Sequence, residues 1–192
     1  MKSSTRLLII VVIQTLVLAG MIAKRQWTLA TGTPVVLETQ PIDPRSLFRG
    51  DYVTFNYAIS RLRLDQLAGD KEFRRHDTVY VVLTPGEPYW QPVAVYRAMP
   101  QLTAAQVALK GEVTYTFDQW WNRDTNKSEP LKNISVRYGI EDYFVPEGEG
   151  RKLERQRQGE KVSLQVAVDR YGNGAIQALL INGVERYRET LF

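Results

Sequence analysis

The sequence of 192 residues contains no cysteine and only one histidine, His76. The absence of cysteine excludes disulfide bonds, thiolate metal sites and cysteine nucleophiles. A histidine-based catalytic triad would have to use His76, which lies in the charged sequence Arg-Arg-His-Asp and is predicted to be an exposed turn residue. A metal site would depend on carboxylates, with His76 as the only histidine available. The sequence therefore predicts neither a metal nor a cofactor.

The chain also has little excess charge. It carries 25 lysines and arginines against 21 aspartates and glutamates, a formal net charge of +4. Basic pairs such as Arg74-Arg75 and Arg151-Lys152 are interrupted by acids, so no continuous nucleic-acid-binding surface is predicted. With 44% hydrophobic and 24% charged residues, the composition is typical of a globular protein that buries a core.

One long hydrophobic run stands near the N-terminus, from Leu7 to Ala23. Seventeen helical residues at about 1.5 Å each span roughly 26 Å, close to the lower limit for crossing the apolar part of a bilayer. Lys24, Arg25 and Trp27 follow at the expected interface. A cleaved signal peptide is the competing interpretation, but no clear cleavage site precedes a mature start, and an uncleaved signal anchor is favoured.

The pattern predicts three parts of the chain. Residues 1–27 form a transmembrane signal anchor with its flanks, 28–33 a short polar tether, and 34–192 an extracytoplasmic β-rich domain. Basic residues flank both ends of the apolar run. The orientation therefore rests on the expectation that a bulky domain after a short basic N-terminus is exported.

Short alternating segments predict a mainly β fold of antiparallel strands and hairpins. Strands are expected at 35–39 and 52–60, the latter with Val53, Phe55, Tyr57 and Ile59 on its core face. Further expected elements are a hairpin centred on 85–88, a long bent strand or a strand pair at 106–117 with Gly111 at the bend, and a C-terminal meander that turns at Asn182-Gly183.

One or two short helices complete the prediction. Residues 61–70 are expected to form a short amphipathic turn or helix, and 151–158 have helix-forming composition before Gly159. The polar segment 118–133 is predicted to be a loop that carries Trp120 and Trp121. At least one of these indoles is expected to be exposed and to contact a partner or lipid headgroups.

The segment before the 52–60 strand, PIDPRSLFRGDYVTFNY, combines two prolines, several charged residues and a Gly-Asp-Tyr turn. Proline fixes φ, aspartate stabilises turns and glycine permits a positive φ, so a rigid corner is favoured over a ligand site. An Arg-carboxylate pair would hold such a corner. The residues of this motif are Asp43, Pro44, Arg45, Arg49, Gly50, Asp51, Tyr52 and Tyr57.

Residues 50–57, Gly-Asp-Tyr-Val-Thr-Phe-Asn-Tyr, resemble the signature of the GDYXXLXY family of bacterial membrane-anchored proteins. The sequence departs from it at Phe55, where the family pattern has leucine. The upstream corner and VRYGIEDYFVPEGEGRKLE at 136–154 are also similar to this family. The resemblance implies a single-pass protein with an extracytoplasmic domain and no established activity, often accompanied by multi-spanning membrane proteins. The predicted location is the bacterial inner membrane, with the domain in the periplasm.

The anchor, the β domain and the Pro-containing loop before Gly-Asp also resemble serine proteases of the signal-peptidase type. Such a mechanism needs a serine and a desolvated lysine within hydrogen-bond reach. Ser46 lies at a different offset from the nucleophile of those enzymes, and neither Lys71 nor Lys110 stands in a matching motif. A membrane-tethered hydrolase therefore remains the alternative.

The function expected from the sequence is that of a non-enzymatic accessory domain that docks onto an integral membrane protein. Besides the hydrolase, a further alternative is a module that binds glycan or peptide in the cell envelope. The helix is expected to contact lipid. The residues predicted to form the docking surface are Trp120, Trp121, Glu141, Asp142, Tyr143, Glu147, Glu149 and Arg151.

Overall fold

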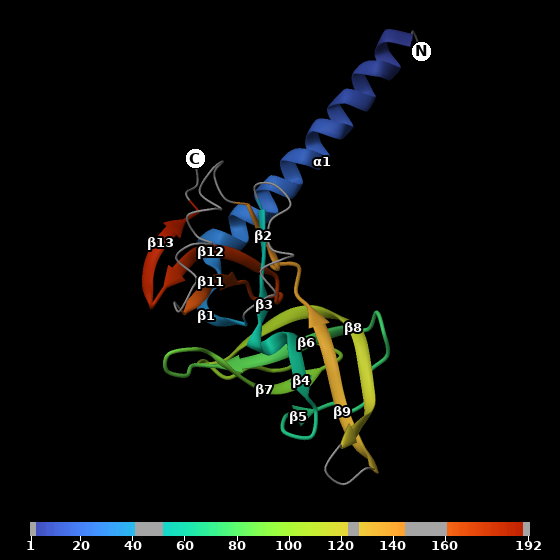
Figure 1. Ribbon diagram of the computed structural model, residues 1–192. Helices are drawn as coiled ribbons and strands as arrows, with labels where there is room; N and C mark the ends of the chain where they lie inside the picture. Colours follow the sequence, from blue (N-terminus) through green and yellow to red (C-terminus); the bar gives the residue numbers. More distant parts are fainter. Residues whose placement is uncertain (1–2, 41–51, 123–126, 145–160, 190–192) are drawn as a thin grey trace.

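The computed structural model describes residues 3–40, 52–122, 127–144 and 161–189. A long helix, α1 (Ser3–Thr31), leads into a head built from strands (Figure 1). Over Ser4–Thr31 this is the one helix in the described ranges that is long and apolar enough to cross a membrane. Its apolar side chains, such as Leu7 and Leu16, are exposed. An N-terminal helix of this kind serves as a membrane anchor or a signal sequence.

The first sheet of the head has five antiparallel strands. Their order is β13 (Val184–Arg188), β12 (Gly174–Ile181), β11 (Val162–Val168), β1 (Thr33–Gln40) and β3 (Asn56–Tyr57). Strands β11, β12 and β13 are the predicted C-terminal meander. The predicted turn at Asn182-Gly183 is confirmed, because both residues have positive φ, 52° and 78°.

The second sheet has six strands and provides the other half of the core. Their order is β4 (Arg61–Arg63), β9 (Lys127–Arg137), β8 (Val107–Asn122), β6 (Thr78–Thr84), β7 (Gln91–Tyr96) and β5 (Ala68–Gly69). Strands β6 and β7 form the predicted hairpin around 85–88. Only the short β5–β7 pair is parallel among the described strands, so the prediction of a mainly antiparallel β fold is confirmed.

A third, two-stranded sheet joins β2 (Tyr52–Thr54) to β10 (Asp142–Phe144). The buried side chains of the two large sheets form one hydrophobic cluster, with Leu37, Leu109, Ile134 and Leu164 among its least exposed members. Phe55, Tyr57 and Ile59 point inward, as the alternation predicts, since they are 1–3% exposed.

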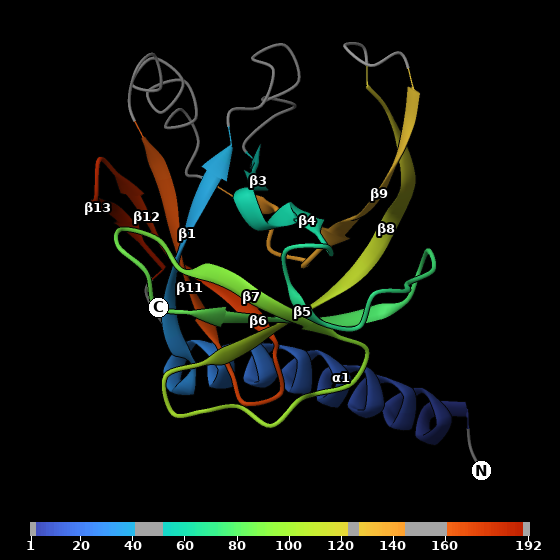
Figure 2. The same ribbon diagram turned by 90° about the horizontal axis from the view of Figure 1, so that it is seen from below.

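Helix α1 is joined to the head without a tether, which corrects the prediction for residues 28–33. The helix continues to Thr31, and β1 begins at Thr33. Thr28 is buried, and its hydroxyl donates to Asp169 Oδ2 at 2.9 Å. The helix end packs on β11 and β12 (Figures 1 and 2). The polar composition of 28–33 thus reflects a hydrogen-bonded contact with the head.

Two further contacts complete this helix joint. Arg25 forms a 2.9 Å ion pair with Glu189, which follows β13. Gly32 sits against backbone on two sides: a Cβ at this position would lie 2.6 Å from Thr28 O and 2.9 Å from Val168 N. We call Arg25, Thr28, Gly32, Asp169 and Glu189 the helix joint. It fixes the direction in which the helix leaves the head.

Three other predictions for local structure are corrected in whole or in part. Residues 61–70 contain the predicted turn, between β4 and β5, and not the alternative short helix. A 3₁₀ turn, η2 (Ala58–Ser60), interrupts the expected 52–60 strand. The 118–133 segment is mostly strand, because β8 and β9 pair from Asn122–Lys127 onward. Backbone pairing between β8 and β9 does not require an apolar side-chain pattern, so a polar sequence can form these strands.

Strand β8 is one long strand, as one of the two predictions for 106–117 had it. Its register shifts lie at 113/115 and 117/119, beyond Gly111. Gly111 pairs regularly with Val79 in β6, and its missing side chain leaves room for Val136. The helix predicted at 151–158 lies outside the described residues.

Candidate functional site

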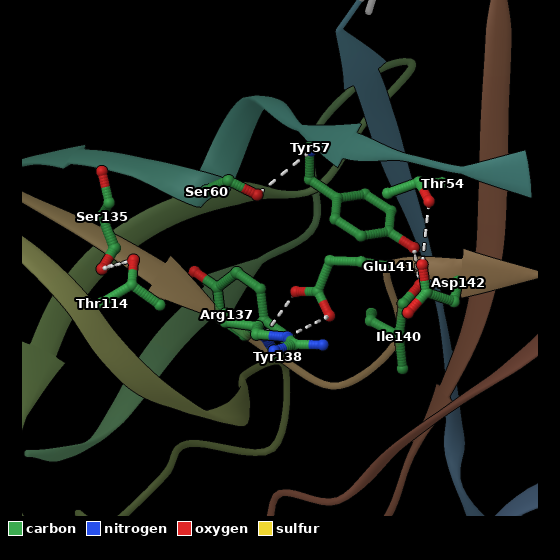
Figure 3. Close-up of polar contacts among 10 residues, drawn as sticks. All are labelled: Thr54, Tyr57, Ser60, Thr114, Ser135, Arg137, Tyr138, Ile140, Glu141 and Asp142. Carbon is green, nitrogen blue, oxygen red and sulfur yellow. Dashed lines mark hydrogen bonds and ion pairs between the residues drawn. The ribbon is translucent and has the colours of Figure 1, made fainter. Parts of the chain in front are cut away.

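The two sequence stretches that carry the family resemblance are adjacent in the fold. Strand β2 pairs antiparallel with β10, which places Thr54 opposite Asp142 and Tyr52 opposite Phe144. The pairing continues where Phe55 N donates to the carbonyl of Glu141 at 2.7 Å. Residues almost 90 positions apart therefore form one continuous contact, which we call the motif seam (Figure 3).

Two buried tyrosines brace the motif seam in opposite directions. Tyr57 of β3 donates its hydroxyl hydrogen to the carbonyl of Ile140. Tyr138 donates to the carbonyl of Ile59 at 2.7 Å. Burial raises the pKa of both phenols well above the usual value, and the charge of Glu141 raises it further. Both side chains are therefore neutral hydrogen-bond donors at physiological pH, and their role in the seam is structural.

Removal of the hydrogen bond from Tyr138 to the carbonyl of Ile59 is expected to lower the stability of the head. The Tyr138→Phe substitution keeps the ring but leaves the carbonyl of Ile59 without its donor, and an unpaired buried polar group costs about 1–3 kcal/mol. We expect that loss in the free energy of unfolding, measured by urea titration of the full chain in detergent. Tyr115→Phe is the control, since Tyr115 is 58% exposed and its hydroxyl is accessible to water. Equal values for the two variants would contradict the bracing role.

The two acids of the seam are fixed by their neighbours (Figure 3). Glu141 Oε1 accepts a hydrogen bond from Tyr138 N at 2.5 Å, and its Oε2 lies 4.0 Å from Arg137 Nε. Asp142 Oδ1 accepts from the hydroxyl of Thr54 at 2.9 Å. These bonds set the positions of both carboxylates at the edge of a groove.

This motif groove has a volume of about 520 Å³. Polar side chains line most of it: Gln40, Thr54, Asn56, Ser60, Arg61, Thr114, Tyr115, Ser135, Arg137, Glu141 and Asp142. Two arginines face two carboxylates, so the charges balance. Such a surface offers many hydrogen-bond donors and acceptors around one exposed ring, that of Tyr115. It is suited to bind a polar chain or a neutral polar ligand.

A family model described as GDYXXLXY protein matches residues 14–179, which is most of the chain. The chain belongs to the GDYXXLXY family. The match begins inside α1 and so includes Thr28, Gly32 and Asp169 of the helix joint together with both halves of the motif seam. No curated protein and no solved structure matches this GDYXXLXY protein.

The structure describes only part of the family signature. Tyr57, its final tyrosine, is buried in the seam, and Phe55, at the position of the family leucine, is 2% exposed. Tyr52 begins β2. The corner residues before it lie outside the described residues: Asp43, Pro44, Arg45, Arg49, Gly50 and Asp51.

The residues predicted to form one docking surface lie in two places. Glu141 and Asp142 border the motif groove, and Tyr143 pairs with Val53 beside it. Trp120 pairs with Glu129 near the end of the β8–β9 hairpin. Strand β9 connects the two places and covers roughly 26 Å from Glu129 to Arg137, at about 3.3 Å per residue. The hairpin end and the motif groove are therefore separated by about this length of strand.

The end of the β8–β9 hairpin lies on the side of the head opposite α1 in both views (Figures 1 and 2). The contact of Trp120 or Trp121 with lipid headgroups stays a prediction. Glu147, Glu149 and Arg151 lie outside the described residues.

The residues considered for a hydrolase are not brought together where they are described. Lys71 Nζ donates to the backbone carbonyls of Leu64 and Leu67 and lines a different cavity. Lys110 lies in β8, and Ser46 is outside the described residues. His76 is exposed, as predicted, with Nδ1 2.6 Å from Glu112. The described residues contain no group of three or more potential metal ligands of the His, Cys, Asp and Glu type.

Sequence reasoning missed Arg61, Arg137 and Tyr138. Arg137 and Tyr138 stand within the second stretch that resembles the family, VRYGIEDYF, directly before a glycine that permits the turn, Gly139 with φ 75°. An aromatic residue at such a strand end is a signal for a buried brace. Arg61 has no comparable signal, because only the β4–β9 pairing places it at the groove.

Proposed function

We propose that this GDYXXLXY protein is a single-pass protein of the bacterial inner membrane whose head lies in the periplasm and docks onto an integral membrane protein. In this role α1 is an uncleaved anchor and the head is not an enzyme. The motif groove provides the first contact with the partner, and the Trp120–Trp121 end of the β8–β9 hairpin provides a second.

The helix joint carries this proposal. A flexible tether would let the head sample many orientations, whereas the buried Thr28–Asp169 hydrogen bond and the close packing of Gly32 hold it in one. The joint continues directly from the apolar part of α1. A groove held at a constant height and angle above the bilayer loses less orientational entropy when it binds another protein in the same membrane.

The fixed carboxylates of the motif groove support a protein partner. Polar groups whose positions are already set lose little side-chain entropy on binding. The mixture of arginines, carboxylates and hydroxyls resembles the polar rim of transient interfaces, in which charge complementarity sets the register of the partner. The partner segment we expect is polar and of mixed charge.

Photo-crosslinking in native membranes tests this function. A photoreactive residue at Asn56, which is exposed beside the groove, is expected to capture a multi-spanning membrane protein identified by mass spectrometry. A second probe at Trp120 tests the hairpin contact. Val184, 58% exposed on β13 at the opposite edge of the five-stranded sheet from β3, is the control position and should give no such product.

Two results would contradict the proposal. The first is failure of the Asn56 probe to capture any multi-spanning protein. The second is a C-terminal topology reporter that is active in the cytoplasm, or a mature chain trimmed near residue 23 and found in the soluble fraction. Crosslinks from Val184 alone would move the docking surface to the β13 edge of the five-stranded sheet.

A further inference from the structure

A second cavity, of about 560 Å³, lies apart from the motif groove, between the 64–77 segment and strands β8 and β9. Four cationic side chains line it, against two carboxylates, Glu72 and Asp77. The cations are Lys71, Arg74, Arg97 and Lys132. We propose that this basic cavity binds a small oxyanion, a carboxylate or a phosphate. The inference does not depend on the docking function proposed above.

The 64–77 segment forms one wall of the cavity, and hydrogen bonds hold its first half against the neighbouring strands. Leu64 N donates to the carbonyl of Lys132 at 2.9 Å. Asp70 N donates to the carbonyl of Val95 at 2.8 Å, and Asp70 Oδ2 in turn accepts from Arg97 N at 2.9 Å. These bonds hold the start of the segment against β9 and against the end of β7.

The other end of the segment is fastened to β8. His76 N donates to the carbonyl of Val113 at 2.7 Å, and Val113 N donates to the carbonyl of Asp77 at 2.9 Å. Asp77 Oδ2 accepts from Arg74 N at 2.8 Å, which closes the turn. A wall secured at both ends keeps its shape in the absence of ligand, so binding an anion costs little reorganisation.

Two of the cations are held in position by the protein. Lys71 Nζ donates to the carbonyl of Leu64 at 2.5 Å and also to that of Leu67. The guanidinium of Arg97 lies 5.6 Å from the centre of the Phe73 ring and donates to the carbonyl of Glu72. Carbonyl groups and aromatic rings carry no net charge, so these contacts do not neutralise the two cations, but they fix the positions of the two side chains.

The other two cations are available to a ligand. The side chains of Arg74 and Lys132 make no hydrogen bond or ion pair with the part of the chain that the structure describes. An arginine fork and a lysine ammonium are the groups that bind carboxylate and phosphate oxygens most strongly. Arg74 and Lys132 approach the cavity from different elements, the 64–77 segment and β9, so they can contact one anion from two sides.

The charge balance separates this basic cavity from the motif groove. In the groove two arginines meet two carboxylates, whereas the cavity has four cations and two carboxylates. One of those carboxylates, Asp77, is already bonded to Arg74 N and lies 3.8 Å from Arg97. Buried Leu64 and Ile134 form an apolar part of the lining, which strengthens the attraction of an anion by lowering the local dielectric constant. The cavity therefore concentrates small anions.

Titration of the full-length protein in a neutral detergent tests the inference. Inorganic phosphate and succinate are added separately at low ionic strength, and binding is followed by calorimetry and by backbone amide chemical shifts. We expect at least one anion to bind saturably, with shifts at residues 71–77, 97 and 132, and with an affinity that falls as salt is added. Stronger binding of phosphate or of succinate identifies which oxyanion class the cavity takes.

The variants separate a site from general electrostatic attraction. Arg74→Ala combined with Lys132→Ala is expected to weaken binding about tenfold or more, because two charge-assisted contacts are lost. Lys110→Ala combined with Arg186→Ala removes the same charge from exposed positions outside the cavity and should change the affinity less than about twofold. Equal weakening by the two pairs would overturn the proposal.

Absence of saturable binding of both phosphate and succinate to the unmodified protein would also overturn the proposal. That measurement needs no variant and therefore does not depend on how the substitutions fold. Shifts confined to the motif groove would likewise refute the assignment to the basic cavity.

Discussion

Replacing Phe55 by alanine is expected to lower the free energy of unfolding of the head by about 3–5 kcal/mol. Phe55 is 2% exposed and belongs to the core shared by the two large sheets. It also stands in the motif seam, where its backbone N donates to the carbonyl of Glu141. Loss of the ring leaves a cavity where the signature strand enters the core, so we expect the seam to loosen together with the core.

The measurement is urea unfolding of the full chain in detergent, followed by tryptophan fluorescence. Phe55→Leu introduces the residue of the family pattern and should cost only about 1–2 kcal/mol, because most of the apolar volume is kept. Phe117→Ala removes the same ring from a position that is 46% exposed and should cost much less. An effect of Phe55→Ala as small as that of Phe117→Ala would show that the seam is not part of the stable core.

Replacing Asp169 by alanine is expected to release the C-terminal end of α1 from the head and to cost about 3 kcal/mol. Its carboxylate accepts hydrogen bonds from the hydroxyl of Thr28, from Tyr171 N and from Asn173 N, each at 2.9 Å. Without it these donors lose a charged acceptor, and bonds of this kind contribute about 1.5–3 kcal/mol each, with sums that are not additive.

Hydrogen exchange of the amides at 24–32 measures the release directly. We expect exchange in this segment to rise strongly in Asp169→Ala while the apolar part of α1 stays protected. Asp65→Ala is the matched control, since Asp65 is exposed and its carboxylate pairs with the neighbouring Arg63 at 2.8 Å, and it should leave these amides unchanged. If Asp169→Ala leaves 24–32 protected, the helix joint is not what orients the head.

The helix joint should also weaken in acid. Burial alone would raise the pKa of Asp169, but the hydrogen bonds from Asn173, Thr28 and Tyr171 together outweigh it and lower the pKa below its usual range. A lowered pKa in the folded state contributes stability above the unfolded pKa of about 3.9 and loses it as the pH falls through the folded value. Protection of 24–32 should therefore fall below about pH 4, and Asp169→Asn should lack this dependence.

Much of the fold is legible in the sequence because local periodicity reports burial. The alternation in 52–60 placed Phe55, Tyr57 and Ile59 inside, and the Asn182-Gly183 dipeptide placed the last hairpin. Periodicity was misleading where the environment changes along a strand. The polar composition of 118–133 predicts a loop, yet β8 runs to Asn122 and β9 begins at Lys127, because backbone pairing between strands does not depend on an alternating side-chain pattern.

Only part of the candidate site is predictable from the sequence, because some of its residues are brought together by contacts between distant segments. The charged sequence around Glu141 and Asp142 predicts a contact surface, and both residues border the motif groove. Trp120 lies near the other end of β9 from them, and the sequence gives no measure of this separation because it depends on how the two strands pair. Arg61 and Tyr138 contribute through contacts with segments about 75–80 residues away, which no local pattern records.

By itself the sequence determined that this GDYXXLXY protein has an apolar helix of membrane-spanning length followed by a mainly antiparallel β head, because hydrophobic length and alternation are local properties. Only the tertiary structure decided that residues 28–31 are part of a rigid joint, that the two family stretches form one seam, and that four cations surround one cavity. Those features depend on the pairing of distant strands and on buried hydrogen bonds such as Thr28–Asp169. The reason is physical: burial and partner choice are set by the packed chain as a whole.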